Sequence, residues 1–379
     1  MIVPFLSLGG VLMSSRPGRS PRAVALAAPV LAALVLGVAA CGGGSSGGAG
    51  TSGGGKQAAK DVTLAMITAT TTQNAFQEMA FGAKAAAGVE GVKLNSAAPN
   101  GINGPQEVQL FQAAMQTSKD GIATMTTTPD LFVRPFSQAV ARGIPQVSVD
   151  TPPPAGSNVD TFVGNDNVQV GEVLANAILA KIPANATGEI VLGNPIPGLP
   201  VLDQRVQGIK QVLRQKRPNI KLVGPLNTGP EPTQNFNAWQ GIVKAHPDAL
   251  AYLDPGDQAA VSLARIQQRT GKRLLVGGAD VDPVALQAVK DGRVYALADP
   301  EHWLKGYIAI ALLARRARDG TPLPKGWWNP GASLVTAKNI DDILARQRNS
   351  TTRAAWYKAI VDKQLADPSA YLQPLPGGK

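Results

Sequence analysis

From Asp61 onward, short apolar runs alternate with longer amphipathic segments, and this alternation limits most strongly which folds are open to the chain. The first run, residues 62–67, contains no charge and predicts a strand buried on both faces. Residues 76–87 follow with apolar side chains at helical spacing and end beside Gly88. Repetition of this strand–helix pair predicts an α/β protein with doubly wound parallel sheets, which bind ligands beyond the carboxyl ends of their strands.

One series of strand–helix pairs ends near residue 164, and a second series with the same layout follows it. The further predicted strands are 92–94, 121–126, 145–149, 161–163, 189–192, 220–223, 250–253, 273–276 and 293–298. The further predicted helices are 106–117, 136–142, 168–182, 202–214, 236–244, 257–269, 284–290 and 301–318. Two rounds of one layout, over about 320 residues, predict two similar lobes.

The segment before Asp61 has the pattern of an export signal. Cys41, the single cysteine, closes an uncharged apolar run over residues 23–40, and three arginines precede that run. Small residues stand directly before Cys41, and residues 42–55 consist only of Gly, Ser, Ala and Thr. This arrangement resembles the lipobox of bacterial lipoproteins, in which the cysteine is acylated and becomes the new N-terminus. A transmembrane anchor is the alternative, because the run approaches the roughly 20 residues that span a bilayer. The Ala, Gly and Pro content of the run makes it a poor permanent span, and the position of Cys41 favours cleavage.

Residues 1–12 are apolar and precede the basic segment, so Met13 fits better as the true start. We therefore expect a signal peptide over residues 1–40, a lipidated Cys41, and a flexible tether extending to residue 58. The predicted location is the extracytoplasmic side of the membrane.

Composition and motifs argue against catalysis and nucleic-acid binding. The net charge of +10 is not gathered in a dense basic block, and an exported protein does not routinely meet nucleic acid. One cysteine excludes an internal disulfide framework. His246 and His302 lie far apart and without metal-ligand spacing, and the chain contains no nucleophile elbow. Residues 193–198 have glycines spaced as in a phosphate loop but lack the Lys and Ser/Thr that would follow. We expect no enzyme activity and no cofactor.

Seven motifs, taken in order, resemble the type I periplasmic binding proteins of the ribose-binding, sugar-transporter class. They lie at residues 142–150, 164–171, 205–208, 245–250, 256–260, 277–280 and 331–339. The resemblance covers Asp61 to about Leu344. It implies two lobes joined by three hinge crossings, near Gly164, Asp299 and Trp328, that close on a ligand. It also implies a monomer that delivers a sugar-like or polyol-like molecule to an ABC permease.

The resemblance divides the chain into two discontinuous lobes. Residues 59–164 with 300–328 are expected to form the N-terminal lobe. Residues 165–299 with 329–379 are expected to form the C-terminal lobe and a tail.

Site residues are expected where the family's motifs match this chain. In the loop after the first strand, Gln73 and Asn74 can bond sugar hydroxyls, and Phe76 can stack on a sugar face. Phe76 could equally be the first core position of its helix. Thr126, or its neighbour Met125, stands where the family has an asparagine.

The remaining expected ligand residues are mostly charged. Asp150 ends a strand at the cleft, where a carboxylate can accept bonds from adjacent hydroxyls. Arg205 could bond a ring oxygen, or could be an exposed helix residue. Asp257 and Asp280 match cleft carboxylates, although either could instead cap a following helix. Asp299 stands where relatives have Gln or Asn.

Several positions depart from the family's pattern and leave the ligand open. Gly256, Asp203 and Ala279 replace an Asn, an Arg and an aromatic residue, and we could not predict whether Phe236 or Trp239 faces the cleft. A second function with the same fold is a sensor module that presents its bound solute to a membrane kinase or chemoreceptor. A lac-repressor-type regulator would need a helix-turn-helix where the signal peptide stands.

Overall fold

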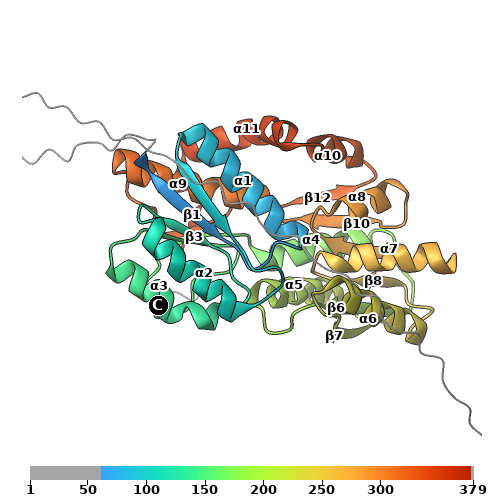
Figure 1. Ribbon diagram of the computed structural model, residues 1–379. Coiled ribbons are helices and arrows are strands. Elements are labelled where there is room, and N and C mark those ends of the chain that lie inside the picture. Colours follow the sequence, from blue (N-terminus) through green and yellow to red (C-terminus); the bar gives the residue numbers. More distant parts are fainter. Residues whose placement is uncertain (1–60, 377–379) are drawn as a thin grey trace, which may run out of the picture. The chain divides into compact units, whose positions relative to one another are not determined.

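The structure, a computed structural model, describes residues 61–376, which belong to one compact unit (Figure 1). It contains two sheets, with strand orders β13-β11-β5-β4-β3-β1-β2 and β12-β10-β9-β8-β6-β7. The strands of the first sheet are β1 (Thr63–Ile67), β2 (Lys93–Ala97), β3 (Ile122–Thr124), β4 (Gln146–Val149), β5 (Thr161–Val163), β11 (Gly326–Trp328) and β13 (Leu372–Gln373). Those of the second sheet are β6 (Gly188–Asn194), β7 (Ile220–Asn227), β8 (Ala251–Leu253), β9 (Val276–Ala279), β10 (Ala296–Asp299) and β12 (Ser333–Thr336).

Each sheet is covered by its own helices and forms one lobe. The helices of the first lobe are α1 (Asn74–Glu90), α2 (Gly104–Thr117), α3 (Val133–Ala141), α9 (His302–Asp319) and α11 (Ser350–Ala366), with short 3-10 helices at Pro129–Phe132 and Pro368–Tyr371. Those of the second lobe are α4 (Asn167–Leu179), α5 (Pro200–Lys216), α6 (Pro232–Ala245), α7 (Gln258–Thr270), α8 (Pro283–Lys290) and α10 (Ile340–Arg346). Apart from β12 and β13, which pair antiparallel at sheet edges, the strand pairs are parallel. The predicted doubly wound α/β fold with two lobes is confirmed.

Several predicted elements differ from the observed ones by a few residues; the strand expected over residues 293–298, for example, is β10 at Ala296–Asp299. The strand expected over residues 273–276 lies at β9, three residues later, because small residues are needed there: a side chain on Gly277 would collide with Ile178 and Leu253. The helix α9 was expected to bury one stripe, yet residues 302–314 are buried on all sides. It lies between α1, α11 and the first sheet, which explains its continuous apolar composition.

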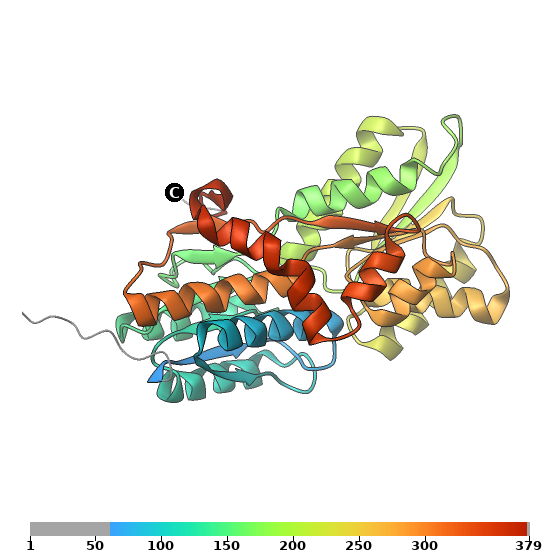
Figure 2. The same cartoon turned by 90° about the horizontal axis from the view of Figure 1, so that it is seen from above.

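The C-terminal region departs from the expected division of the chain. After α10, which packs on the second lobe, the chain returns to the first lobe, where α11 lies against α1 and α9 and β13 pairs with β11 (Figure 2). Tyr357 and Val361 of α11 belong to the same hydrophobic cluster as Trp328. The lobes are therefore joined by a fourth crossing, between α10 and α11, in addition to the three expected, because the first lobe has an apolar face that α11 buries.

Helix pairs meet at reciprocal glycines in both lobes. A Cβ on Gly82 of α1 would lie 1.9 Å from the Trp303 carbonyl oxygen of α9, and one on Gly306 would lie 1.9 Å from the Met79 carbonyl oxygen. Gly171 and Gly208 make the same close approach between α4 and α5. These crossings fix the positions of α9 and α5, which carry charged residues of the site described below.

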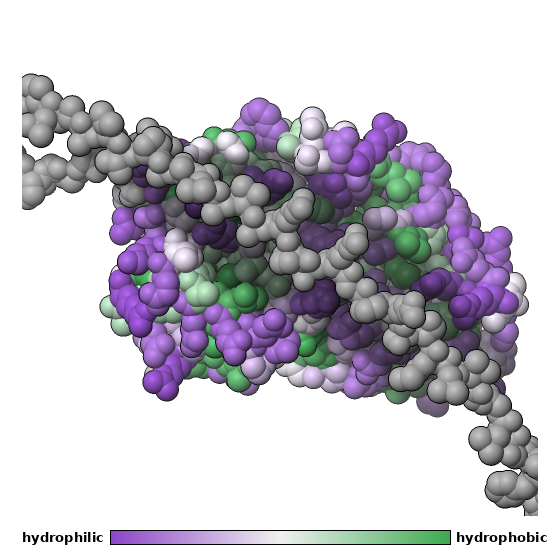
Figure 3. Space-filling view, in the orientation of Figure 1, coloured by the Kyte–Doolittle hydropathy of each residue, from purple (hydrophilic) through white to green (hydrophobic). Residues whose placement is uncertain are grey.

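The visible face of the described part is mostly hydrophilic, with smaller groups of hydrophobic side chains among the polar ones (Figure 3). None of the helices within residues 61–376 is long and apolar enough to cross a membrane. The predicted signal peptide, the acylated Cys41 and the tether lie outside the described residues.

Candidate ligand-binding site

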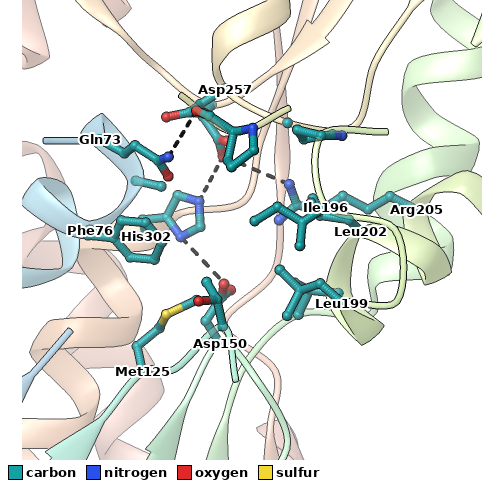
Figure 4. A pocket seen from close by; sticks show the side chains of 17 residues that line it. Gln73, Phe76, Met125, Asp150, Ile196, Leu199, Leu202, Arg205, Asp257 and His302 are labelled. Carbon is teal, nitrogen blue, oxygen red and sulfur yellow. Dashed lines mark hydrogen bonds and ion pairs between the residues drawn. The ribbon is translucent and has the colours of Figure 1, made fainter. Parts of the chain in front are cut away.

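A small cavity lies where residues of both lobes converge at the carboxyl ends of the strands (Figure 4). The first lobe contributes Gln73, Ala75, Phe76, Met125, Thr127, Asp150 and His302, and the second contributes Pro195, Ile196, Leu199, Val201, Leu202, Arg205, Pro230, Gly256, Asp257 and Asp280. Its volume is about 50 Å³, room for only a few water molecules. The amide of Gln73 donates to the Pro230 carbonyl oxygen at 3.1 Å, so the lobes are in direct contact across the cavity.

Asp150 and Asp280 hold equivalent positions in the two lobes. Each follows a central strand, β4 or β9, and each has a positive φ, 62° and 68°. Each donates its backbone N–H to the next strand, to the Val163 and Ala298 carbonyl oxygens at 2.8 Å. Left-handed backbone at non-glycine residues costs free energy and is concentrated at functional sites. Here it turns both carboxylates towards the cavity.

A chain of polar contacts joins these two carboxylates through α9. Lys305, with no exposed side-chain surface, forms an ion pair with Asp150, and its Nζ lies 3.2 Å from His302 Nδ1. The other ring nitrogen of His302, Nε2, lies 2.7 Å from Asp280 Oδ1. The imidazole therefore bridges the first lobe to the second.

The electrostatics of the two carboxylates follow from this chain of contacts. Burial raises the pKa of Asp150, but the charge of Lys305 opposes burial, and the pKa is lowered to about 2. At Asp280, burial likewise raises the pKa, while His302 and the Arg205 guanidinium hold it below its usual range. Both carboxylates are therefore ionised at neutral pH.

Arg205 is a buried cleft residue and not an exposed helix arginine. Its side chain is 3% exposed; Nε donates to the Asn167 carboxamide oxygen at 2.9 Å and Nη1 to the Pro255 carbonyl oxygen at 2.8 Å. Nη1 also lies 4.0 Å from Asp280. Three contacts from different segments hold the guanidinium rigidly at the cavity wall.

Neither Asp257 nor Asp280 caps a helix. Asp257 precedes α7 but makes no side-chain capping bond, and α8 is capped by Asp282, whose carboxylate accepts from Val284 and Ala285. Burial, followed by the charge of Asp280, raises the pKa of Asp257 to about 8. The capping alternative for the two cavity aspartates is thus excluded, and both carboxyl groups are available to a ligand.

Six of the expected ligand residues line the cavity. These are Gln73, Phe76, Asp150, Arg205, Asp257 and Asp280. Phe76 fits both interpretations of its role: it lines the cavity, and it also belongs to the hydrophobic core cluster of the first lobe.

Three expected ligand residues do not line the cavity. Asn74 is buried in the first turn of α1. Thr126 donates its hydroxyl to Glu107 at 3.0 Å, and its neighbour Met125 lines the cavity instead. Asp299 forms a buried ion pair with Arg346 of α10 at 2.7 Å. Because α10 follows the third crossing, it supplies a cation that the sequence did not place beside Asp299.

Phe236 and Trp239 also lie away from the cavity. Trp239 is fully buried in the core of the second lobe and packs edge-on against Tyr252. Phe236 packs beneath the guanidinium of Arg269.

His302 and Lys305 were missed by the sequence analysis. They stand at i and i+3 near the start of α9, next to a run of apolar residues that is otherwise buried throughout. Two polar residues one turn apart on a fully buried helix need partners, and this was the available signal. The apolar wall at residues 195–202 was also missed, because a proline-rich loop carries no periodicity.

The model of a family described as "Periplasmic binding protein domain" matches residues 64–321. The chain belongs to this family. Membership implies an exported, extracytoplasmic protein.

Curated relatives are identical to this chain at about a quarter of the aligned positions. The ribose import binding protein RbsB of Bacillus subtilis is 24% identical over 250 residues, which cover 66% of this chain and 80% of that protein. The D-allose-binding periplasmic protein of Escherichia coli is 24% identical over 292 residues, which cover 75% and 91%. These relatives are substrate-binding proteins, not enzymes, which confirms the prediction of a non-enzyme.

Solved structures share the fold. A solute-binding protein of an ABC transporter from Burkholderia graminis, crystallised with D-arabinose, superimposes with a TM-score of 0.69 at 24% identity, covering 75% of this chain and 98% of its own. The glucose-galactose binding protein GanP of Geobacillus stearothermophilus gives a TM-score of 0.66 at 23% identity, covering 73% and 98%. The type I periplasmic binding protein fold is thereby confirmed.

Proposed function

We propose that this chain is the solute-binding component of an ABC importer and captures a small polyhydroxylated ligand between its lobes. The observation that carries the proposal is the pairing of Asp150 and Asp280, one from each lobe, at a single cavity. Ionised carboxylates accept strong hydrogen bonds from hydroxyl groups, and residues from both lobes can contact one ligand only when the lobes meet. The relatives named for ribose and allose support this ligand class.

Capture by hinge closure follows from the way the lobes are connected. The chain passes between them at residues 164–166, 300–301, 329–332 and 347–349. Across the cavity itself, few hydrogen bonds join the lobes within residues 61–376: the Gln73 amide donates to Pro230, and the His302 ring bonds Asp280. Short crossings and few bonds between lobes favour rotation about the crossings, with the cavity opening to admit the ligand.

Anchoring by lipid at Cys41 completes the proposal. Acylation would place the protein at the outer face of the membrane, beside its permease. Residues 42–55 would span about 20 Å as a flexible chain, which lets the lobes reach the permease while they remain attached.

A ligand screen tests the function directly. Purified full-length protein is heated with a panel of pentoses, hexoses, polyols and cyclitols, and a bound ligand raises the melting temperature by mass action. We expect at least one member to raise it in the wild type and to lose this effect in Asp280→Asn. If no panel member shifts the wild-type melting temperature, the proposed ligand class is wrong.

Mass spectrometry of the same mixtures then separates binding from catalysis. We expect the ligand that binds best to be recovered unchanged after prolonged incubation. A product that accumulates with time would contradict a pure binding role.

A further inference from the structure

The three aspartates that line the cavity differ in whether a basic side chain lies beside them. Lys305 pairs with Asp150, and Asp280 takes both His302 at 2.7 Å and Arg205 at 4.0 Å. Each of the two ionised carboxylates thus has a cationic or donor side chain beside it. Asp257, which lines the same cavity, has neither an ion pair nor a basic hydrogen-bond donor among the described residues.

Asp257 lies instead among other acids. Its Oδ2 accepts from the Gln258 amide at 3.1 Å, and Oδ1 has no hydrogen-bond partner within residues 61–376. The carboxyl groups around it are Asp254 at the end of β8, and Asp280 and Asp282 after β9. Two basic groups line the cavity from other elements, Arg205 of α5 and His302 of α9, and they lie 4.0 Å and 2.7 Å from Asp280. Asp257 is only 7% exposed, so within the described part of the chain neither a cation nor bulk water stabilises the ionised form of its carboxyl group.

We propose that the ligand of this cleft carries a protonated amine, and that Asp257 is its counter-ion. The proposal rests on the proposed function and deepens it: the ligand class becomes an amino sugar or another small polyol with one ammonium group. An ammonium donates three hydrogen bonds, and here it would meet a free carboxylate oxygen inside a water-poor cavity. A neutral hydroxyl could bond the same oxygen but would not stabilise the ionised form of the carboxyl group.

One wall of the cavity is apolar, which suits a ligand with few hydroxyl groups on one side. Ile196, Leu199 and Leu202 form this wall, and Phe76 and Met125 of the first lobe add apolar surface to the cavity. The family's asparagine before Asp257 is replaced by Gly256, where a Cβ would lie 2.6 Å from the Pro195 ring. No amide can enter at that position, so the second lobe offers carboxylates in place of a neutral donor.

The protonation of Asp257 gives the proposal a separate signature. Its pKa is raised to about 8 by burial and by Asp280, so the empty site holds a proton at pH 6 to 7. Binding of an ammonium requires the carboxylate, so one proton leaves when the complex forms. The affinity for an amine should therefore rise about tenfold for each pH unit between 6 and 7, and level off near 8.

The test uses matched sets of ligands on the full-length protein: glucosamine, glucose and glucuronate, the corresponding amino, neutral and acidic forms of galactose and ribose, and the amino and neutral forms of inositol. Calorimetry measures affinity, and buffers of different ionisation enthalpy measure proton release. We expect an amino form to bind at least tenfold more tightly than its neutral counterpart, with release of close to one proton at pH 6.5.

Two variants locate the effect. Asp257→Asn should lower amine affinity tenfold to a hundredfold, the range for losing a bond to a charged group, and should abolish proton release. Asp282→Asn is the matched control: it removes a nearby negative charge outside the cavity while asparagine still caps α8, so the amine preference should remain.

The outcomes distinguish failure of the amine proposal from failure of the solute-binding function on which it rests. Tightest binding of a neutral or acidic form, or an unchanged amine preference in Asp257→Asn, overturns the amine proposal while the solute-binding function stands. Failure of every compound in the panel to bind overturns the solute class itself, and the amine proposal with it.

Discussion

The crossing of α1 and α9 allows a sharp prediction about stability. Of two glycines in α1, Gly82 lies at the crossing and leaves no room for a side chain, whereas Gly88 lies away from it. In Gly82→Ala, the new methyl group would lie 1.9 Å from the Trp303 carbonyl oxygen and 3.0 Å from the Tyr307 nitrogen. Ordinary contact begins near 3.4 Å, so the helices must part by more than 1 Å. In Gly88→Ala, the methyl group meets nothing within 4 Å.

The two substitutions should change the free energy of unfolding in opposite directions. Alanine stabilises a helix interior by about 1 kcal/mol relative to glycine, and this gain should appear in full at the exposed Gly88. At Gly82, parting the helices by more than 1 Å forfeits about half or more of the dispersion energy of each contact along the crossing. Overpacking costs about 1–3 kcal/mol and occasionally more. We expect Gly82→Ala to be less stable than the wild type by about 2 kcal/mol and Gly88→Ala to be more stable by about 0.5–1 kcal/mol.

Urea unfolding followed by tryptophan fluorescence measures this difference. Of the five tryptophans, only Trp239 lies in the second lobe, so the signal reports mainly on the lobe that contains the α1–α9 crossing. The midpoint should fall for Gly82→Ala and rise for Gly88→Ala at an unchanged slope. Gly82→Ala should also weaken ligand binding, because α9 carries His302 and Lys305. A Gly82→Ala midpoint equal to or above that of the wild type would refute the close crossing.

Three further results are expected. Asp150→Asn should lower stability by about 3–5 kcal/mol in urea unfolding, because it leaves the buried Lys305 ammonium without its counter-charge; equal stability would show that this lysine is neutral or has another partner. Glu107, whose pKa burial raises to about 8, stabilises the fold fully below pH 4.5 and loses this contribution as pH rises through 8. Glu107→Gln should therefore be more stable than the wild type above pH 8, and melting curves that run parallel at all pH values would contradict this. Cys41→Ser should move the protein from the membrane to the soluble fraction, whereas continued membrane attachment would identify the hydrophobic segment as an anchor.

Local signals in the sequence predicted the lobes and most of their elements. Apolar runs and helical spacing depend on residues close together in the chain, so β1, α1, α2 and β5 were located to within a few residues. Asp150 could be predicted for the same reason, because in this fold the end of a parallel strand is also the edge of the cleft, whereas Asp280 was predicted from its match to the family's motif.

The pairing of side chains in the site was decided only by the tertiary structure. Asp299 looked like a ligand residue until α10 brought Arg346 beside it, and α9 brought Lys305 to Asp150 from 155 positions away. The return of α11 to the first lobe could not be predicted either, because its partner surface is built from α1 and α9 together. The sequence by itself determined which elements form and which strand ends meet, because those are local properties. Distances that arise only when separate elements pack decide which charges neutralise one another, and they leave Asp257 without a cationic partner within residues 61–376.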